Sequence, residues 1–193
     1  MARPLFHGKK NSMALEHLLE SIPDYAKDLR LNWSSLLGGS DLTDTQKWGT
    51  VIASAYVSRN PALLDAISEE AAKAGVSAEV INAAKGAAAI MGMNNIYYRF
   101  QHLTTNENYS TMPARLRMNI MRTHGADAVD FELWSIAASA INGCGKCVHA
   151  HEKTVREKGV GEEVILHVIR LASVVHAIAA VLDSERVAEA VAQ

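Results

Sequence analysis

Apolar side chains recur every three or four residues through most of the chain, which is the spacing of one face of an α-helix. The first such stripe consists of Leu15, Leu18, Leu19 and Ile22. Alanine is frequent, proline occurs only four times, and no hairpin dipeptide lies between two alternating segments. The pattern therefore predicts an all-α fold.

Capping residues divide the first half into helices. We predict a helix over 21–29, and Thr43 with Gln46 has capping-box spacing at the start of another helix over 44–58. The segment 104–113 is polar and aperiodic, which is typical of a loop.

The second half begins again near residue 130 with three further predicted helices. They span 131–141, 144–159 and 162–182, and Asn142-Gly143 separates the first two. The last helix is apolar on most faces. Its apolar surface is larger than a single three-helix unit would bury. This helix therefore suggests assembly with other copies.

Parts of the two halves resemble each other. Residues 75–81 (GVSAEVI) match 159–165 (GVGEEVI) at an offset of 159 − 75 = 84, and Trp48 echoes Trp134 at an offset of 134 − 48 = 86. The match indicates duplication of a three-helix unit, with chance similarity between alanine-rich helices as the alternative. Only the second copy carries thiols.

The domain organisation follows from these patterns. Residues 13–193 are predicted to form a single helical domain with repeat halves at about 44–100 and 130–185. Residues 1–12 lack a helical stripe, and we interpret them as an extension outside the fold or a frayed arm.

Composition narrows the function. The 193 residues have a net charge of −2 and a pI of about 6.4, which argues against a nucleic-acid groove. We expect no membrane span, because polar residues interrupt every apolar stretch before the ~20 residues that a span needs. No secretory signal is recognised, so we expect a cytoplasmic protein.

The only two cysteines, Cys144 and Cys147, form a C-x-x-C pair. Such a pair in a reducing compartment points to catalysis or metal binding rather than to a structural disulfide. A helix advances ~100° per residue, so these cysteines and His151 fall within about 60° on one helix face. This arrangement can activate a sulfur nucleophile at neutral pH.

The residues alone leave the order of the two thiols open. Cys144 lies at a helix start, where backbone N–H groups favour a thiolate, whereas Cys147 lies within reach of the His151 imidazole. Glu132 precedes Cys144 by twelve residues in an otherwise apolar helix and needs a partner if it is buried. Folding back at the helix break would let Glu132 face His151.

The pattern Glu132-x11-Cys144-x-x-Cys147-x3-His151 resembles the signature of the alkyl hydroperoxidase D family, within the carboxymuconolactone decarboxylase-like superfamily. The resemblance covers about residues 13–185. It also includes the segments 23–28 (PDYAKD), 86–95 (GAAAIMGMNN), 116–120 (LRMNI) and 131–135 (FELWS).

The resemblance implies an all-helical homotrimer that reduces organic hydroperoxides without a bound cofactor or metal. Dihydrolipoamide, carried on a lipoylated protein, would supply the electrons, and a peroxiredoxin, the C subunit of alkyl hydroperoxide reductase, would be the partner. Cys147 would attack the peroxide and become a sulfenic acid. Cys144 would donate the proton, close the disulfide and exchange with the partner, and Glu132 with His151 would relay protons.

One position departs from the family pattern. Some members carry a histidine immediately before the second cysteine, where this chain has Lys146. An ammonium group is a poor proton shuttle near neutral pH, although its charge can stabilise a thiolate. Lys146 is therefore a candidate auxiliary residue.

Other interpretations stay open. The chain can be a non-redox decarboxylase-like enzyme of the same superfamily, or an adaptor that binds zinc through the two cysteines, His151 and Glu132. We expect His149 at the surface and His176 in the core or at a subunit interface. The methionines Met91, Met93, Met118 and Met121 are predicted to fill the core.

Overall fold

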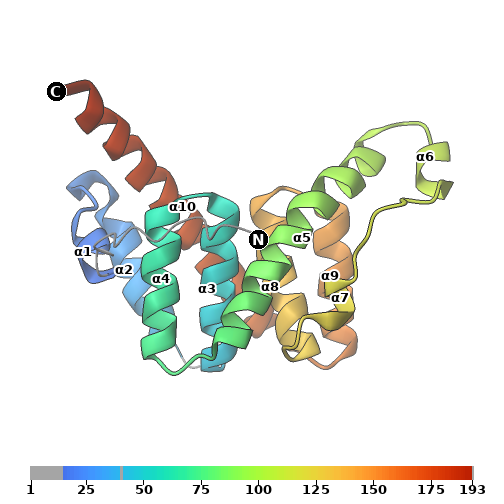
Figure 1. Cartoon of the computed structure of the whole chain (residues 1–193), viewed down its shortest axis with the longest axis horizontal. Helices are drawn as coiled ribbons and strands as arrows, with labels where there is room; N and C mark the ends of the chain where they lie inside the picture. Colours follow the sequence, from blue (N-terminus) through green and yellow to red (C-terminus); the bar gives the residue numbers. More distant parts are fainter. Residues whose placement is uncertain (1–14, 40, 193) are drawn as a thin grey trace, which may run out of the picture.

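The computed structural model describes residues 15–39 and 41–192, and all regular structure in them is helical (Figure 1). The all-α prediction is confirmed. The elements are α1 (Leu15–Glu20), a 3₁₀ helix (Asp24–Ala26), α2 (Lys27–Leu37), α3 (Asp44–Ser58), α4 (Pro61–Lys73), α5 (Ala78–Leu103), α6 (Asn108–Thr111), α7 (Ile120–Thr123), α8 (Ala128–Ile141), α9 (Gly145–Glu157) and α10 (Glu162–Ala192). Residues 1–12 lie outside the described part.

Capping residues and prolines determine where the helices begin. The capping box is confirmed: the Thr43 hydroxyl accepts from the Gln46 backbone N–H at 3.2 Å, and the Gln46 side chain accepts from the Thr43 N–H at 3.1 Å. The helix predicted over 21–29 is confirmed only in part: residues 24–26 form a 3₁₀ helix and α2 begins at Lys27. Residues 21–23 are not helical, because Pro23 disfavours helical geometry in the residue before it. The predicted loop 104–113 contains the single-turn helix α6.

The core is built around a close crossing of α3 and α8. Trp134 on α8 is fully buried, and its indole N–H donates to the carbonyl of Gln46 at 3.3 Å. A Cβ at Gly49 would lie 2.1 Å from the Trp134 ring, so only glycine lets α3 approach this closely. Helices α5 and α10 complete the packing around this pair.

The helices of the two halves begin at matching positions. Asp127 and Thr43 cap α8 and α3, and Cys144 and Asn60 cap α9 and α4. Both differences, 127 − 43 and 144 − 60, equal 84. Helices α4 and α9 each contain 13 residues. Counted from these caps, the position in α3 that corresponds to Glu132 is Trp48. The match of Trp48 with Trp134, at an offset of 86, is therefore shifted by two residues from the offset of the caps.

Helix α10 is longer than the predicted 162–182 and extends to Ala192. Its segment Glu162–Ala188 is long and apolar enough to cross a membrane by length and composition, so our expectation that no stretch reaches this size is wrong. Core helices meet the same test, and α10 packs against α2, α3 and α8. Less than half of the most apolar segment of α10 is buried. The C-terminal end of α10 projects away from the other helices (Figure 1).

Candidate active site

The α8–α9 turn places the first cysteine. Gly143 has a φ of 69°, which favours glycine, and its N–H donates to the carbonyl of Ala140 at 3.1 Å. The N–H of Cys144 donates to the carbonyl of Ser139 at 3.0 Å. These bonds end α8 and direct the chain at once into α9, so Cys144 becomes the N-cap of α9.

The two sulfurs form a disulfide, with Cα atoms 5.3 Å apart. Cys144 Sγ also accepts from the backbone N–H of Cys147 at 3.3 Å. A donor aimed at this sulfur, together with the helix N-terminus, stabilises negative charge on Cys144 when the disulfide opens.

A cavity of about 270 Å³ reaches only the second sulfur. Its walls come from α5, α7, α9 and the segment before α7, and they consist of Asn94, Tyr98, Met118, Met121, Lys146, Cys147, Ala150 and His151. Cys144 is 0 % exposed and is absent from these walls. Of the predicted core fillers, Met91 is fully buried, and Met121 packs against the core and also lines this cavity. Met118 lines the cavity.

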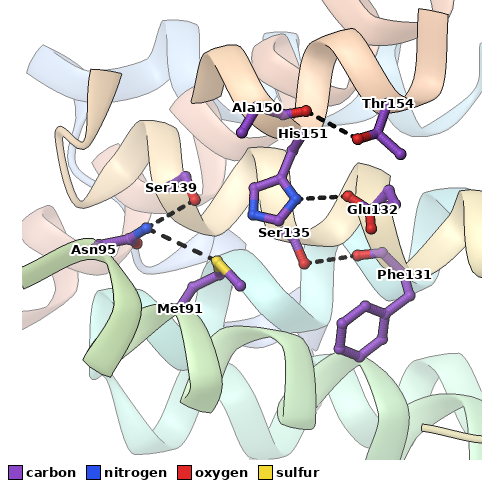
Figure 2. Close-up of polar contacts among 9 residues, drawn as sticks. All are labelled: Met91, Asn95, Phe131, Glu132, Ser135, Ser139, Ala150, His151 and Thr154. Atoms are coloured by element: carbon purple, nitrogen blue, oxygen red, sulfur yellow. Dashed lines mark hydrogen bonds and ion pairs between the residues drawn. The ribbon is translucent and has the colours of Figure 1, made fainter. Parts of the chain in front are cut away.

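Glu132 and His151 meet across the α8–α9 pair. His151 Nδ1 lies 2.5 Å from Glu132 Oε2, and both side chains are largely buried (Figure 2). With Nδ1–H donating to the carboxylate, Nε2 on the other side of the ring can accept or return a proton. His151 and Cys147 line the same cavity, so the imidazole lies beside the space that Cys147 faces.

A buried amide network supports the turn that carries the cysteines. Asn95 Nδ2 donates to Ser139 Oγ at 2.9 Å (Figure 2), and Asn95 Oδ1 accepts from Asn142 Nδ2 at 2.9 Å. Arg99 Nη1 then donates to the Asn142 carbonyl at 2.5 Å. Sequence reasoning missed these partners. The two adjacent asparagines in an Ala- and Met-rich helix could have indicated them, because buried amides need hydrogen-bond partners.

Lys146, His149 and His176 are the other candidate residues that the sequence analysis singled out. Lys146 is exposed, donates to Gln101 Oε1 at 3.1 Å and lies 5.6 Å from the centroid of the Tyr98 ring. His149 is exposed, as predicted. His176 is not a core residue: it is exposed, and its Nδ1 lies 3.1 Å from Ser58 Oγ.

Within the described residues, no group of three or more His, Cys, Asp and Glu side chains is arranged to hold a metal ion. The disulfide occupies both thiols that the zinc interpretation needs. In this all-α protein, the site thus consists of a disulfide that joins the N-cap residue of a helix, Cys144, to a cysteine that lines a small cavity, Cys147.

Comparison with known proteins gives the family. A model of the carboxymuconolactone decarboxylase family matches residues 108–190. The chain is similar to proteins named alkyl hydroperoxide reductase AhpD from Acidobacterium capsulatum (58% identity, 91% of this chain, 96% of the relative), Solibacter usitatus (54%, 90% and 97%) and Streptomyces griseus (51%, 91% and 98%). The chain belongs to the AhpD family of alkyl hydroperoxide reductases, which confirms the resemblance found in the sequence.

Proposed function

We propose that this protein reduces organic hydroperoxides through a dithiol–disulfide cycle of Cys144 and Cys147. The observation that carries the proposal is that Cys147 and His151 line one cavity while His151 is bonded to Glu132. The names of the relatives, alkyl hydroperoxide reductase, support the same chemistry. The mostly apolar wall suits a hydroperoxide with an alkyl substituent.

The oxidative half-reaction uses the residues in defined roles. The Cys147 thiolate attacks the terminal oxygen of ROOH, the O–O bond breaks, and Cys147 becomes a sulfenic acid. The alkoxide takes a proton from the Cys144 thiol and leaves as ROH. The resulting Cys144 thiolate attacks the sulfenic sulfur, and the departing hydroxide takes a proton from the Glu132–His151 relay to form water.

We propose dihydrolipoamide on a lipoylated protein as the electron donor and a peroxiredoxin as a protein partner. A lipoyl thiolate that enters the cavity meets Cys147 first and displaces Cys144 as a thiolate. Its second thiol then closes the lipoyl disulfide and releases Cys147. Exchange of Cys144 with a peroxiredoxin requires the turn at 142–144 to open, because Cys144 is fully buried.

Assembly as a homotrimer in the cytoplasm completes the proposal. Exposed apolar side chains along α5 support assembly, since Ile96, Phe100 and Leu103 are 65%, 50% and 74% exposed. The partly uncovered α10 supports it as well. A reducing cytoplasm fits a catalytic C-x-x-C pair. Light scattering after gel filtration measures the mass, and a monomer at micromolar concentration would contradict the trimer.

Consumption of tert-butyl hydroperoxide with dihydrolipoamide as the reductant tests the activity. We expect turnover by the wild-type protein, and loss of turnover in Cys147→Ser. Unchanged turnover in Cys147→Ser would overturn the assignment of the peroxide-attacking thiol. Persistence of a decarboxylase-type activity after both cysteines are replaced would instead favour a non-redox enzyme, the alternative that the name of the matching family model suggests.

A further inference from the structure

Two adjacent asparagines on α5 differ in how their side chains are satisfied. Asn95 is 1% exposed, and both ends of its amide have partners, Ser139 and Asn142. Asn94 is 5% exposed, and its Oδ1 has no hydrogen-bond donor among the described residues. A buried amide oxygen without a donor is disfavoured in a folded protein, so a ligand is a natural partner for it.

Asn94 lies where a substrate would react. It lines the same cavity as Cys147 and His151, and its backbone carbonyl lies 4.0 Å from Cys147 Sγ. One turn before it on the same helix face, Met91 is fully buried and apolar. A leucine would fit this apolar surrounding, and yet the position holds an amide.

We infer that the Asn94 side chain binds the hydroperoxide group and holds it over Cys147. A hydroperoxide has one O–H donor and two oxygens that accept, and a primary amide matches it with one acceptor and two donors. Oδ1 accepts from the terminal O–H, which keeps that oxygen beside the sulfur. The amide N–H₂ donates to the inner oxygen, on which negative charge develops as the O–O bond breaks.

This role adds no reactant to the cycle. The oxygen still transfers from ROOH to the Cys147 sulfur, and the alkoxide still takes its proton from Cys144. The inference rests on the proposed function, because it names the group that binds the same substrate. It predicts that Asn94 acts in the oxidation of the dithiol by peroxide and has no part in the reduction of the disulfide.

Separate measurement of the two half-reactions tests this role with Asn94→Leu, which keeps the size of the side chain and removes the amide. Stopped-flow oxidation of the reduced protein by tert-butyl hydroperoxide is expected to slow by about 10- to 100-fold. Reduction of the oxidised protein by dihydrolipoamide is expected to change by less than about threefold. The matched control is Asn82→Leu, at an exposed position of the same helix.

Four results besides the expected one are informative. An unchanged oxidation rate in Asn94→Leu overturns the inference, and so does an equal loss in both half-reactions, which indicates a structural role. If Asn94→Leu does not fold, Asn94→Ala and Asn94→Ser are measured by the same criterion. A wild-type protein that does not react with hydroperoxide overturns the proposed function itself, which separates that failure from a failure of the Asn94 assignment.

Discussion

Helices α4 and α9 have the same length and the same distance from the preceding helix cap, but their inward positions carry different side chains. At an offset of 84, Asn60 corresponds to Cys144, Leu63 to Cys147 and Ile67 to His151. In α4, Leu63 and Ile67 are fully buried. In α9, the matching positions hold a disulfide sulfur and an imidazole that face a cavity.

The caps of the two helices perform the same local task with different atoms. Asn60 Oδ1 accepts from the N–H of Leu63 at 2.8 Å, and Cys144 Sγ accepts from the N–H of Cys147 at 3.3 Å. Asn60 is further held by Asp183, at 3.0 Å. The comparison shows that the same helix cap forms a disulfide in α9, because the capping atom is sulfur and the next inward position carries a second thiol.

Replacing the capping sulfur gives the largest expected effect. Cys144→Ser is expected to lower peroxide turnover by about 1,000-fold or more, because a sulfenic acid on Cys147 then has no thiol to resolve it. Mass spectrometry after one equivalent of tert-butyl hydroperoxide should find one added oxygen on Cys147. Asn60→Ser, the matched change in α4, should keep turnover per folded molecule. Wild-type turnover in Cys144→Ser would contradict the resolving role.

For stability, the same comparison predicts that the substitution in α4 has a larger effect than the one in α9. Leu63→Ala is expected to lower the free energy of unfolding by about 2–5 kcal/mol, because it leaves a cavity in a fully packed region. Cys147→Ala, measured in reductant, should cost less, since it removes one heavy atom from a position already beside a cavity. Urea unfolding measures both variants. Equal losses would show that α9 is packed as tightly as α4.

The Glu132 position tests the proton relay. Glu132→Gln is expected to lower kcat/KM for hydroperoxide by about 10- to 100-fold, because an amide cannot stabilise the charged imidazole of His151. The matched change in α3 is Trp48→Phe, which should leave kcat/KM unchanged. The pH dependence of Cys147 alkylation by iodoacetamide, in reduced protein with Cys144→Ser, provides a second measurement. An unaltered profile together with unaltered kcat/KM would remove Glu132 from the relay.

Sequence alone predicts the parts of this site that lie on one helix or across one turn. The common face of Cys144, Cys147 and His151 follows from helical spacing, and the turn at 142–143 makes a contact with Glu132 plausible. The part of the cavity wall formed by Met118 and Met121 was missed, because these residues belong to a stretch with little periodicity. The contribution of α5 was also missed, since the contact between Asn95 and Ser139 depends on how two distant helices cross.

The smallest expected effect concerns Asp130, which lies three residues after the N-cap of α8. Asp130 corresponds to Gln46 in α3, and burial raises its pKa, with a further contribution from the nearby Asp127 charge. The folded protein therefore holds a proton that the unfolded chain releases, so this group lowers the free energy of unfolding as the pH rises above 3.8, the ordinary Asp value. Relative to wild type, Asp130→Asn should therefore gain stability between pH 4 and pH 7, by less than about 1 kcal/mol.

Chemical unfolding at both pH values measures this difference. A variant that loses stability relative to wild type between pH 4 and pH 7 would show that the Asp130 carboxylate is stabilised in the folded protein. The hydrogen bond from Gln46, which acts to lower the pKa of Asp130, would then outweigh burial. In that case the two halves would be joined at this point by a favourable contact between their equivalent residues, and Gln46→Ala would reproduce the loss seen in Asp130→Asn.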